Sequence, residues 1–272
     1  MTRPTGSSTK TPRAASAADT RARRAARGGR SRARQGSAAE QVRAGLRERF
    51  AESAALLGEA AAAPREVVHG FRKLMKRVRA IIRLLSDADG LECTFIEQTC
   101  RDVARRFSAL RDLDVMLAAL AARHDAPAYW PADLRQHLLA AREAELARGV
   151  LEQPALDEMT AQLGAADAAV AALALEHLSA GKLRRALERS HRKARRALHR
   201  CRSTLDDEHF HDLRKRCKRE LYQRELLEAV MDLPHRHRTA RLDAVCESLG
   251  EQQDLAVLRR TIAAAGALTP EL

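Results

Sequence analysis

The chain has 272 residues, of which 45% are hydrophobic but only 3% are aromatic, and its charged residues make up 31%. This composition, in which Ala and Leu supply most of the apolar residues, predicts an all-α protein. No run approaches the roughly 18 apolar residues of a transmembrane helix, and no signal-peptide core is present, so we expect no membrane contact and a cytoplasmic protein.

Residues 1–36 differ from the rest of the chain. They hold ten of the 49 Lys and Arg residues and one acid, whereas the remaining residues carry a net charge of only +4. Because large apolar residues are almost absent, we expect a disordered polybasic tail. A transit peptide would share this composition but would carry spaced large hydrophobic residues. The tail is a candidate for weak, non-specific attraction to nucleic acid.

From Ala38 onward the apolar residues recur at helical intervals, and no segment alternates with the period of a strand. Eight helices are expected, over about 38–58, 64–85, 91–123, 132–148, 154–181 and 182–202, then one ending before Pro234, and one over about 235–265. Their short connections suit antiparallel neighbours. The expected fold of residues 37–272 is two antiparallel four-helix bundles, formed by a first half (about 38–150) and a second half (about 151–272).

The second of these helices has one apolar face and one basic face. Its apolar stripe contains Val67, Phe71, Leu74, Met75, Val78, Ile81, Ile82 and Leu85. Its opposite face, the first ladder, contains His69, Arg72, Lys73, Lys76, Arg77, Arg79 and Arg83, with no acid among them. Like charges at this spacing repel each other. The ladder therefore needs a compensating anion, either on a facing helix or in a ligand.

The same basic pattern returns 142 positions later. The second ladder consists of His211, Arg214, Lys215, Lys218 and Arg219. The same offset carries Asp112-Leu113 onto Asp254-Leu255, so the register holds over more than forty residues. A gapless register of this length predicts an internal duplication and hence pseudo-symmetric halves.

The helix over 182–202 carries a further basic stripe, which contains Arg185, Arg189, Arg192 and Arg196. With the two ladders it is expected to line a groove of one sign, although an exposed helix face would look similar. Cations at positions 0, +3, +4, +7 and +8 span about 12 Å of helix. A compact anion would meet one or two of them, and a linear polyanion would meet all of them.

An enzyme is not expected, because the phosphate-binding loop, zinc-protease and serine-hydrolase motifs are all missing from the sequence. Asp112 and Asp254 could be a catalytic or metal-binding pair, but pairing with nearby cations is the better interpretation. The histidines around His209 and His235 lack a suitably spaced thiolate, so neither a metal site nor a cofactor is predicted. The five cysteines are expected to be buried and reduced, although cations near Cys217 could lower its pKa.

The paired H-x-x-R-K-x-x-K-R helices, each followed about forty residues later by Asp-Leu, resemble the CHAD (conserved histidine α-helical domain) family over about residues 38–272. The resemblance implies two four-helix bundles around a basic cavity that binds inorganic polyphosphate, often at polyphosphate granules. It also implies an aromatic residue eleven positions after each histidine, where this chain has Ala80 and Tyr222.

The predicted polyphosphate-binding residues are the first ladder, the second ladder, Tyr222 and the stripe of Arg185, Arg189, Arg192 and Arg196. Two other classes of function stay open. Basic helices and an Arg-rich tail also suit nucleic acid, although exposed aromatics for base stacking are few and no DNA-binding motif is recognised. A scaffold that recruits proteins to granules is the third class. The oligomeric state is not predicted.

Overall fold

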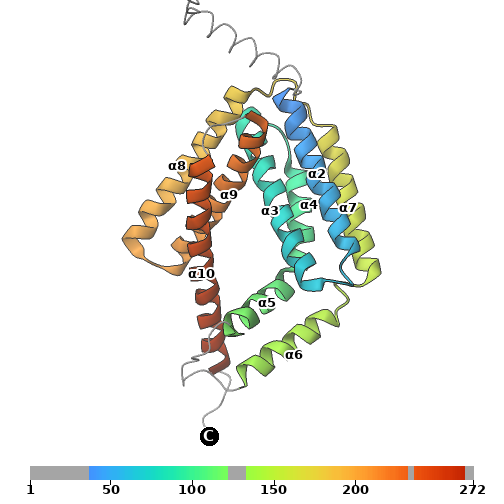
Figure 1. Cartoon of the computed structure of the whole chain (residues 1–272), viewed down its shortest axis with the longest axis vertical. Helices are drawn as coiled ribbons and strands as arrows, with labels where there is room; N and C mark the ends of the chain where they lie inside the picture. The colour runs from blue at the N-terminus through green and yellow to red at the C-terminus, as the bar shows by residue number, and fades with distance from the viewer. Residues whose placement is uncertain (1–36, 122–132, 232–235, 267–272) are drawn as a thin grey trace, which may run out of the picture. The chain divides into compact units, whose positions relative to one another are not determined.

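The computed structural model describes residues 37–121, 133–231 and 236–266, and every regular element in these ranges is a helix. The helices are α2 (Ala38–Gly58), α3 (Pro64–Asp89), α4 (Thr94–Arg106), α5 (Ser108–Ala121), α6 (Leu134–Leu146), α7 (Gln153–Ala171), α8 (Ala180–Thr204), α9 (Asp207–Met231) and α10 (Arg236–Gly266) (Figure 1). The all-α prediction is confirmed. The predicted tail at 1–36 lies outside the described residues.

The predicted third helix is wrong in one respect, because two helices replace it. The chain breaks at Phe107, whose backbone leaves the helical path between α4 and α5 at φ −94° and ψ 8°. The Phe107 ring is fully buried and meets Phe71 edge to face, with 5.4 Å between the ring centroids. After the break α5 packs on α6 and α10, while its Leu110 still belongs to the main core.

The duplication predicted from the sequence also appears in the helix boundaries. Ala38 and Ala180, which begin α2 and α8, lie 142 positions apart, and so do Thr94 and Arg236, which begin α4 and α10. Helix α9 starts one residue later than the same offset from α3 would place it. The first repeat is therefore α2 to α5, the second repeat is α8 to α10, and α6 and α7 lie between them.

The hydrophobic core does not divide between the two halves of the sequence. The apolar stripe of α3 is buried, as predicted, and packs with residues of α2, α4 and α7. Helix α7 belongs to the predicted second half, yet it packs on α2 and α4 of the first repeat. Leu226 and Leu227 of α9 join the same core. The described helices therefore do not form a separate four-helix bundle from each half of the sequence.

A smaller core joins the second repeat to α3. It contains Ala80, Ala194, Ala197, Cys201, Leu213, Cys217, Leu221, Tyr222 and Cys246. All five cysteines of the chain are free and buried, as expected. Burial raises the pKa of the Cys217 thiol to about 12, with smaller contributions from Cys246 and Glu220. The expectation that nearby cations lower this pKa is therefore wrong, because the thiol faces the apolar core.

Helices α3 and α9 meet at equivalent positions of the two repeats. Tyr222 is buried near Ala80, which stands where the resemblance implied a second aromatic residue. The next residue, Gln223, is also buried, and its Nε2 donates a hydrogen bond to the carbonyl oxygen of Ala80 at 2.9 Å. A small residue in one repeat leaves room for a large one from the other. None of the described helices is long and apolar enough to cross a membrane.

Candidate functional site

A cavity of about 580 Å³ lies where α3, α9 and the start of α5 converge. Its lining residues are His69, Arg72, Lys73, Lys76, Arg79, Ala80, Arg83, Arg111, Arg214, Lys215, Lys218, Arg219 and Tyr222. Ten of these are Lys or Arg, and none of the lining residues from the described chain is an acid. A concave surface of one sign concentrates its electrostatic field and attracts anions.

The structure brings together most of the predicted site. Eleven predicted residues line the cavity: His69, Arg72, Lys73, Lys76, Arg79, Arg83, Arg214, Lys215, Lys218, Arg219 and Tyr222. The two ladders, which are far apart in the sequence, therefore share one site. This is the arrangement predicted from their common spacing.

Two ladder residues have other partners. Arg77 turns toward α9, where its Nη2 lies 3.1 Å from Glu225 Oε2 and its guanidinium stacks 5.5 Å from the centroid of Tyr222. His211 forms a hydrogen bond through Nδ1 with Gln253 Oε1 of α10, at 2.9 Å. Both residues hold the walls of the cavity in place and do not line it.

The basic stripe of α8 does not line the cavity, so that part of the prediction is wrong. Arg185, Arg192 and Arg196 are exposed. Arg189 donates from Nη2 to the carbonyl oxygen of Asp87 at the end of α3. Nearby, Lys193 forms an ion pair with Asp87 at 3.3 Å. Acids at the end of α3 thus attract the basic residues of α8, because α8 crosses that end and not the ladder.

Arg111 lines the cavity and was not among the predicted site residues. It stands directly before Asp112, in the Asp-Leu motif that the sequence repeats, at the position that Gln253 occupies in the second repeat. Its Nη1 lies 3.1 Å from Asp112 Oδ1, and its Nη2 lies 3.8 Å from Asp254 Oδ1. The prediction that these acids pair with cations holds for Arg111, which they orient from both repeats.

Some cavity cations already have protein partners. Arg72 donates from Nη1 to the Ala104 carbonyl oxygen at 2.7 Å and to Ser108 Oγ at 2.6 Å. Glu97 of α4 accepts from Arg83 Nε at 2.6 Å and lies 3.5 Å from Arg79 Nη2. These contacts hold the first ladder in a defined geometry. They leave part of each guanidinium facing the cavity.

Other cavity cations have no carboxylate partner within the described ranges. They are Lys73, Lys76, Arg214, Lys215 and Arg219. The buried Nε atoms of Arg72, Arg79 and Arg214 likewise lack a hydrogen-bond acceptor among these residues. Unpaired cations that repel one another destabilise a fold unless an anion joins them. Negative charge placed in the cavity would offset this repulsion.

The electrostatic cost is clearest at Lys76. Burial, followed by the charges of Arg72, Arg111 and Arg214, lowers the pKa of Lys76 to about 8. The side chain remains accessible to solvent, so an anion can reach it. Burial and the neighbouring cations Arg111, Lys73 and Lys76 also lower the pKa of His69. A bound anion would favour the charged form of both groups and raise both pKa values.

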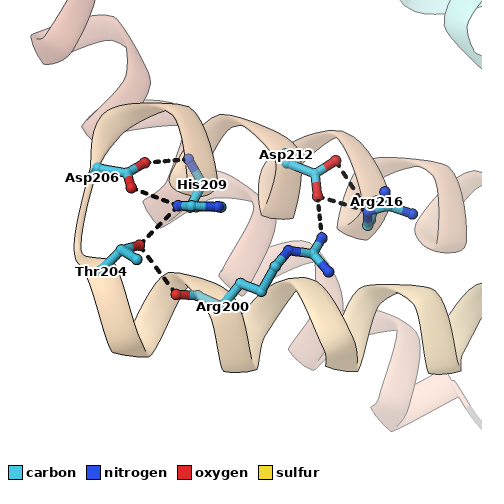
Figure 2. A network of polar contacts seen from close by, with 6 residues as sticks. All are labelled: Arg200, Thr204, Asp206, His209, Asp212 and Arg216. Carbon is cyan, nitrogen blue, oxygen red and sulfur yellow. Dashed lines mark hydrogen bonds and ion pairs between the residues drawn. The ribbon is translucent and has the colours of Figure 1, made fainter.

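The histidines around position 209 have a structural role. Figure 2 shows Thr204, Asp206 and His209 at the junction of α8 and α9. Asp206 Oδ1 accepts a hydrogen bond from the backbone N–H of His209 at 2.7 Å, and Asp206 Oδ2 lies 2.5 Å from His209 Nδ1. This arrangement is an N-terminal cap of α9. No group of three potential metal ligands occurs in the described residues, and His235 lies outside them.

Comparison with known proteins gives two matches. The family model of the CHAD domain matches residues 41–263. A crystal structure of the CHAD domain from the plant Ricinus communis superimposes with a TM-score of 0.64 and 20% sequence identity, covering 87% of this chain and 82% of that one. A search of curated proteins finds no match. The fold of the described helices is thus similar to that of the plant domain.

Proposed function

Because this chain belongs to the CHAD domain family, we propose that it binds inorganic polyphosphate in the cavity between α3 and α9 and catalyses no reaction on it. The observation that carries the proposal is the composition of the cavity lining. Ten Lys or Arg side chains surround one space, and no acid from residues 37–121, 133–231 or 236–266 lines it. Polyphosphate is a chain of closely spaced anionic groups that could neutralise several of these cations at once.

The spacing of the lining residues favours a linear anion. Along α3 they run from His69 to Arg83, which is about 21 Å at the rise of an α-helix. A single phosphate would contact two or three of these side chains and leave the others repelling each other. Arginine can hold phosphate oxygens with two parallel hydrogen bonds, while lysine adapts as a point charge. The lining has both kinds of residue from both ladders.

Nucleic acid is the competing ligand. Proteins that bind single strands commonly stack bases on aromatic side chains. The single aromatic residue among the cavity-lining residues is Tyr222, which is 8% exposed and stacks against Arg77. It is therefore a poor platform for a base. We expect polyphosphate to outcompete nucleic acid that carries the same number of phosphates.

The test is a titration of the full chain with long-chain polyphosphate at several salt concentrations, with nucleic acid as competitor. The cavity variant carries Arg72→Ala, Lys76→Ala, Arg214→Ala and Lys218→Ala. Its matched control carries Arg184→Ala, Arg185→Ala, Arg192→Ala and Arg196→Ala, which remove the same charge from exposed positions of α8. We expect affinity to fall at least 100-fold in the cavity variant and only severalfold in the control. Equal losses would contradict the proposal, as would release of phosphate from the polymer.

The cellular part of the proposal is that binding places the protein at polyphosphate granules. A fluorescent fusion of the full chain should colocalise with granules in a cell that stores polyphosphate. The cavity variant should become diffuse, while the α8 control stays at the granules. Retention of the cavity variant would assign localisation to another surface, such as a scaffold contact.

A further inference from the structure

An apolar groove lies on the second repeat, away from the basic cavity, with which it shares no lining residue. Its volume is about 420 Å³. Its apolar walls are Leu198 and Leu205 of the α8 end, Phe210 and Leu213 of α9, and Val245 and Leu249 of α10. Leu198 is 44% exposed, Leu205 71% and Val245 48%. Three large, exposed apolar side chains around one groove form the kind of surface patch that often marks an interaction site.

The first repeat shows what covers the equivalent surface there. Shifted back by 142 positions, Val245 becomes Val103 and Leu249 becomes Phe107, and both of these are fully buried. They are buried in the core to which α7 contributes Leu156, Met159 and Leu163. Helix α7 packs on α2 and α4, whose counterparts in the second repeat are α8 and α10. The groove is therefore the place that a counterpart of α7 would occupy.

The charges of α7 indicate what kind of helix fits. It carries three acids, Asp157, Glu158 and Asp167, and no Lys or Arg. Glu158 pairs with Arg106 of α4, and Asp167 pairs with Arg47 of α2 at 3.2 Å. The basic walls of the first repeat are thus matched by acids on the helix that covers them.

The second repeat presents similar walls. Helix α8 has no acid from Arg189 to its end, and Arg202 lines the groove itself. Arg195, one turn before Leu198, and Arg241, one turn before Val245, are exposed and have no ion pair within the described ranges. Helix α10 also carries two acids, Glu247 and Glu251, but this part of α8 has no acid next to its arginines. Among the groove-lining residues of the described ranges the one charged side chain is Arg202, so an incoming helix would meet a basic group there.

The backbone at Leu205 is a second unusual feature of the groove. Leu205 ends α8 in the left-handed conformation at φ 53°, where glycine is the usual residue. A leucine there strains the backbone and exposes an apolar side chain at the mouth of the groove. Both penalties would be absent with glycine, and a helix packed over Leu205 would offset them.

From these observations we infer that the groove between α8 and α10 is the docking site for an acidic amphipathic helix of a partner protein, which completes the second repeat as α7 completes the first. The partner's apolar residues contact Leu198, Leu205 and Val245, and its acids face Arg195 and Arg202. This binding is independent of polyphosphate, because the groove and the cavity use different residues.

The test uses the full chain and a fluorescent peptide with the sequence of residues 153–171, which carries the apolar and acidic pattern that the groove requires. Saturable binding is expected, measured by fluorescence anisotropy. A peptide with Asp157→Lys, Glu158→Lys and Asp167→Lys should bind at least tenfold more weakly. Failure of the first peptide to saturate up to 1 mM, on the order of weak helix-in-groove affinities, would overturn the proposal.

Variants separate the groove from other surfaces. Val245→Asp should weaken peptide binding at least tenfold, while Phe95→Asp, at an exposed apolar position of α4, should leave it unchanged. Polyphosphate binding should be the same in both, which shows that each variant is folded. Equal loss in the two variants would overturn the groove assignment. Self-association that Val245→Asp abolishes would make a second copy the occupant, and comparable binding to phosphatidylglycerol vesicles would make it a lipid surface; either result overturns the partner helix.

Discussion

The side chain of Gln223 joins the two ladder helices by donating a hydrogen bond to the backbone carbonyl of Ala80, 143 residues away in the chain, at 2.9 Å. Gln223 is fully buried, and Ala80 lies in the small core where α3 packs against the second repeat. The contact fixes α9 against α3 beside the cavity. It acts together with the ion pair of Arg77 and Glu225 and with the shared apolar core to hold the two ladder helices in place.

Replacing Gln223 should destabilise the chain. Gln223→Leu removes the donor, while the Ala80 carbonyl, which lies inside α3, keeps its helical hydrogen bond, so the expected loss is that of one ordinary hydrogen bond, about 0.5–1.5 kcal/mol. Urea unfolding followed by circular dichroism measures the change. Gln162→Leu is the control, because Gln162 bonds to Glu158 at an exposed site and should change stability by less than about 0.5 kcal/mol. Equal losses in the free energy of unfolding of the two variants would mean that the buried hydrogen bond contributes no more than the exposed one.

Removing the charge of Lys76 should stabilise the ligand-free chain at neutral pH. The folded-state pKa of about 8 lies below the unfolded value of about 10.4. Between these two values the unfolded state binds more protons, so the free energy of unfolding rises with pH, and below pH 8 the folded chain carries the full penalty. Lys76→Met should therefore raise the free energy of unfolding at pH 7, by an amount that shrinks toward pH 10.

Urea unfolding at pH 7 and pH 10 tests this effect, with Arg135→Met as the control. Arg135 lies at an exposed position of α6 and does not line the cavity, so removing its charge should matter little at either pH. A lower free energy of unfolding for Lys76→Met at pH 7 would show that the ammonium group is favourably placed in the empty cavity.

Polyphosphate binding should weaken as the pH rises from 7 to 9. In the free chain Lys76 loses its proton near pH 8, whereas a bound polyanion raises that pKa, so binding takes up a proton. One coupled proton changes affinity by at most about tenfold per pH unit. Calorimetry in two buffers of different ionisation enthalpy measures the uptake. Lys76→Arg, which stays charged throughout this range, should bind with a much smaller uptake near pH 8.

Glu97 should limit the affinity of the cavity. Its carboxylate holds Arg83 and Arg79 and thereby competes with phosphate for them. Glu97→Gln keeps the shape of the side chain but removes the charge, so polyphosphate should bind about two- to fivefold more tightly, the effect of a partly exposed ion pair. Asp102→Asn is the control, since Asp102 pairs with Arg101 at an exposed site of α4. Weaker binding by Glu97→Gln would make the carboxylate a positioning residue for Arg83.

The ladders could be predicted from the sequence because the helical period identifies both the buried apolar face of each helix and the basic face opposite it. The apolar stripe of α3 marks the buried face, and the basic residues then must lie opposite it. The offset of 142 predicted that α9 would repeat the pattern, and the shared cavity agrees with that. The stripe of α8 has the same period, yet Arg189 bonds to the backbone carbonyl of Asp87, and the neighbouring Lys182 and Lys193 pair with Asp89 and Asp87. Periodicity shows which residues share a helix face, but the element that this face contacts depends on how the helices pack.

Two other differences have similar causes. The apolar spacing continues through Phe107, so no pattern marked the break between α4 and α5. Arg111 stands alone among the cavity cations in coming from neither ladder, and only its neighbour Asp112 was singled out by the repeat. A site assembled from three helices was therefore recognised in the two helices that repeat and missed in the third.

Helix α3 packs against α2 and α4, which are close to it in the sequence, and against α8 and α9, which are synthesised much later. Contacts of such long sequence separation require the closure of large loops and slow the folding of a chain. While the first repeat emerges from the ribosome, the face of α3 that meets Gln223 has no partner. We therefore expect the cavity to form late in folding, in one cooperative step with the second repeat, so that a nascent chain carries its cations without yet holding a polyanion.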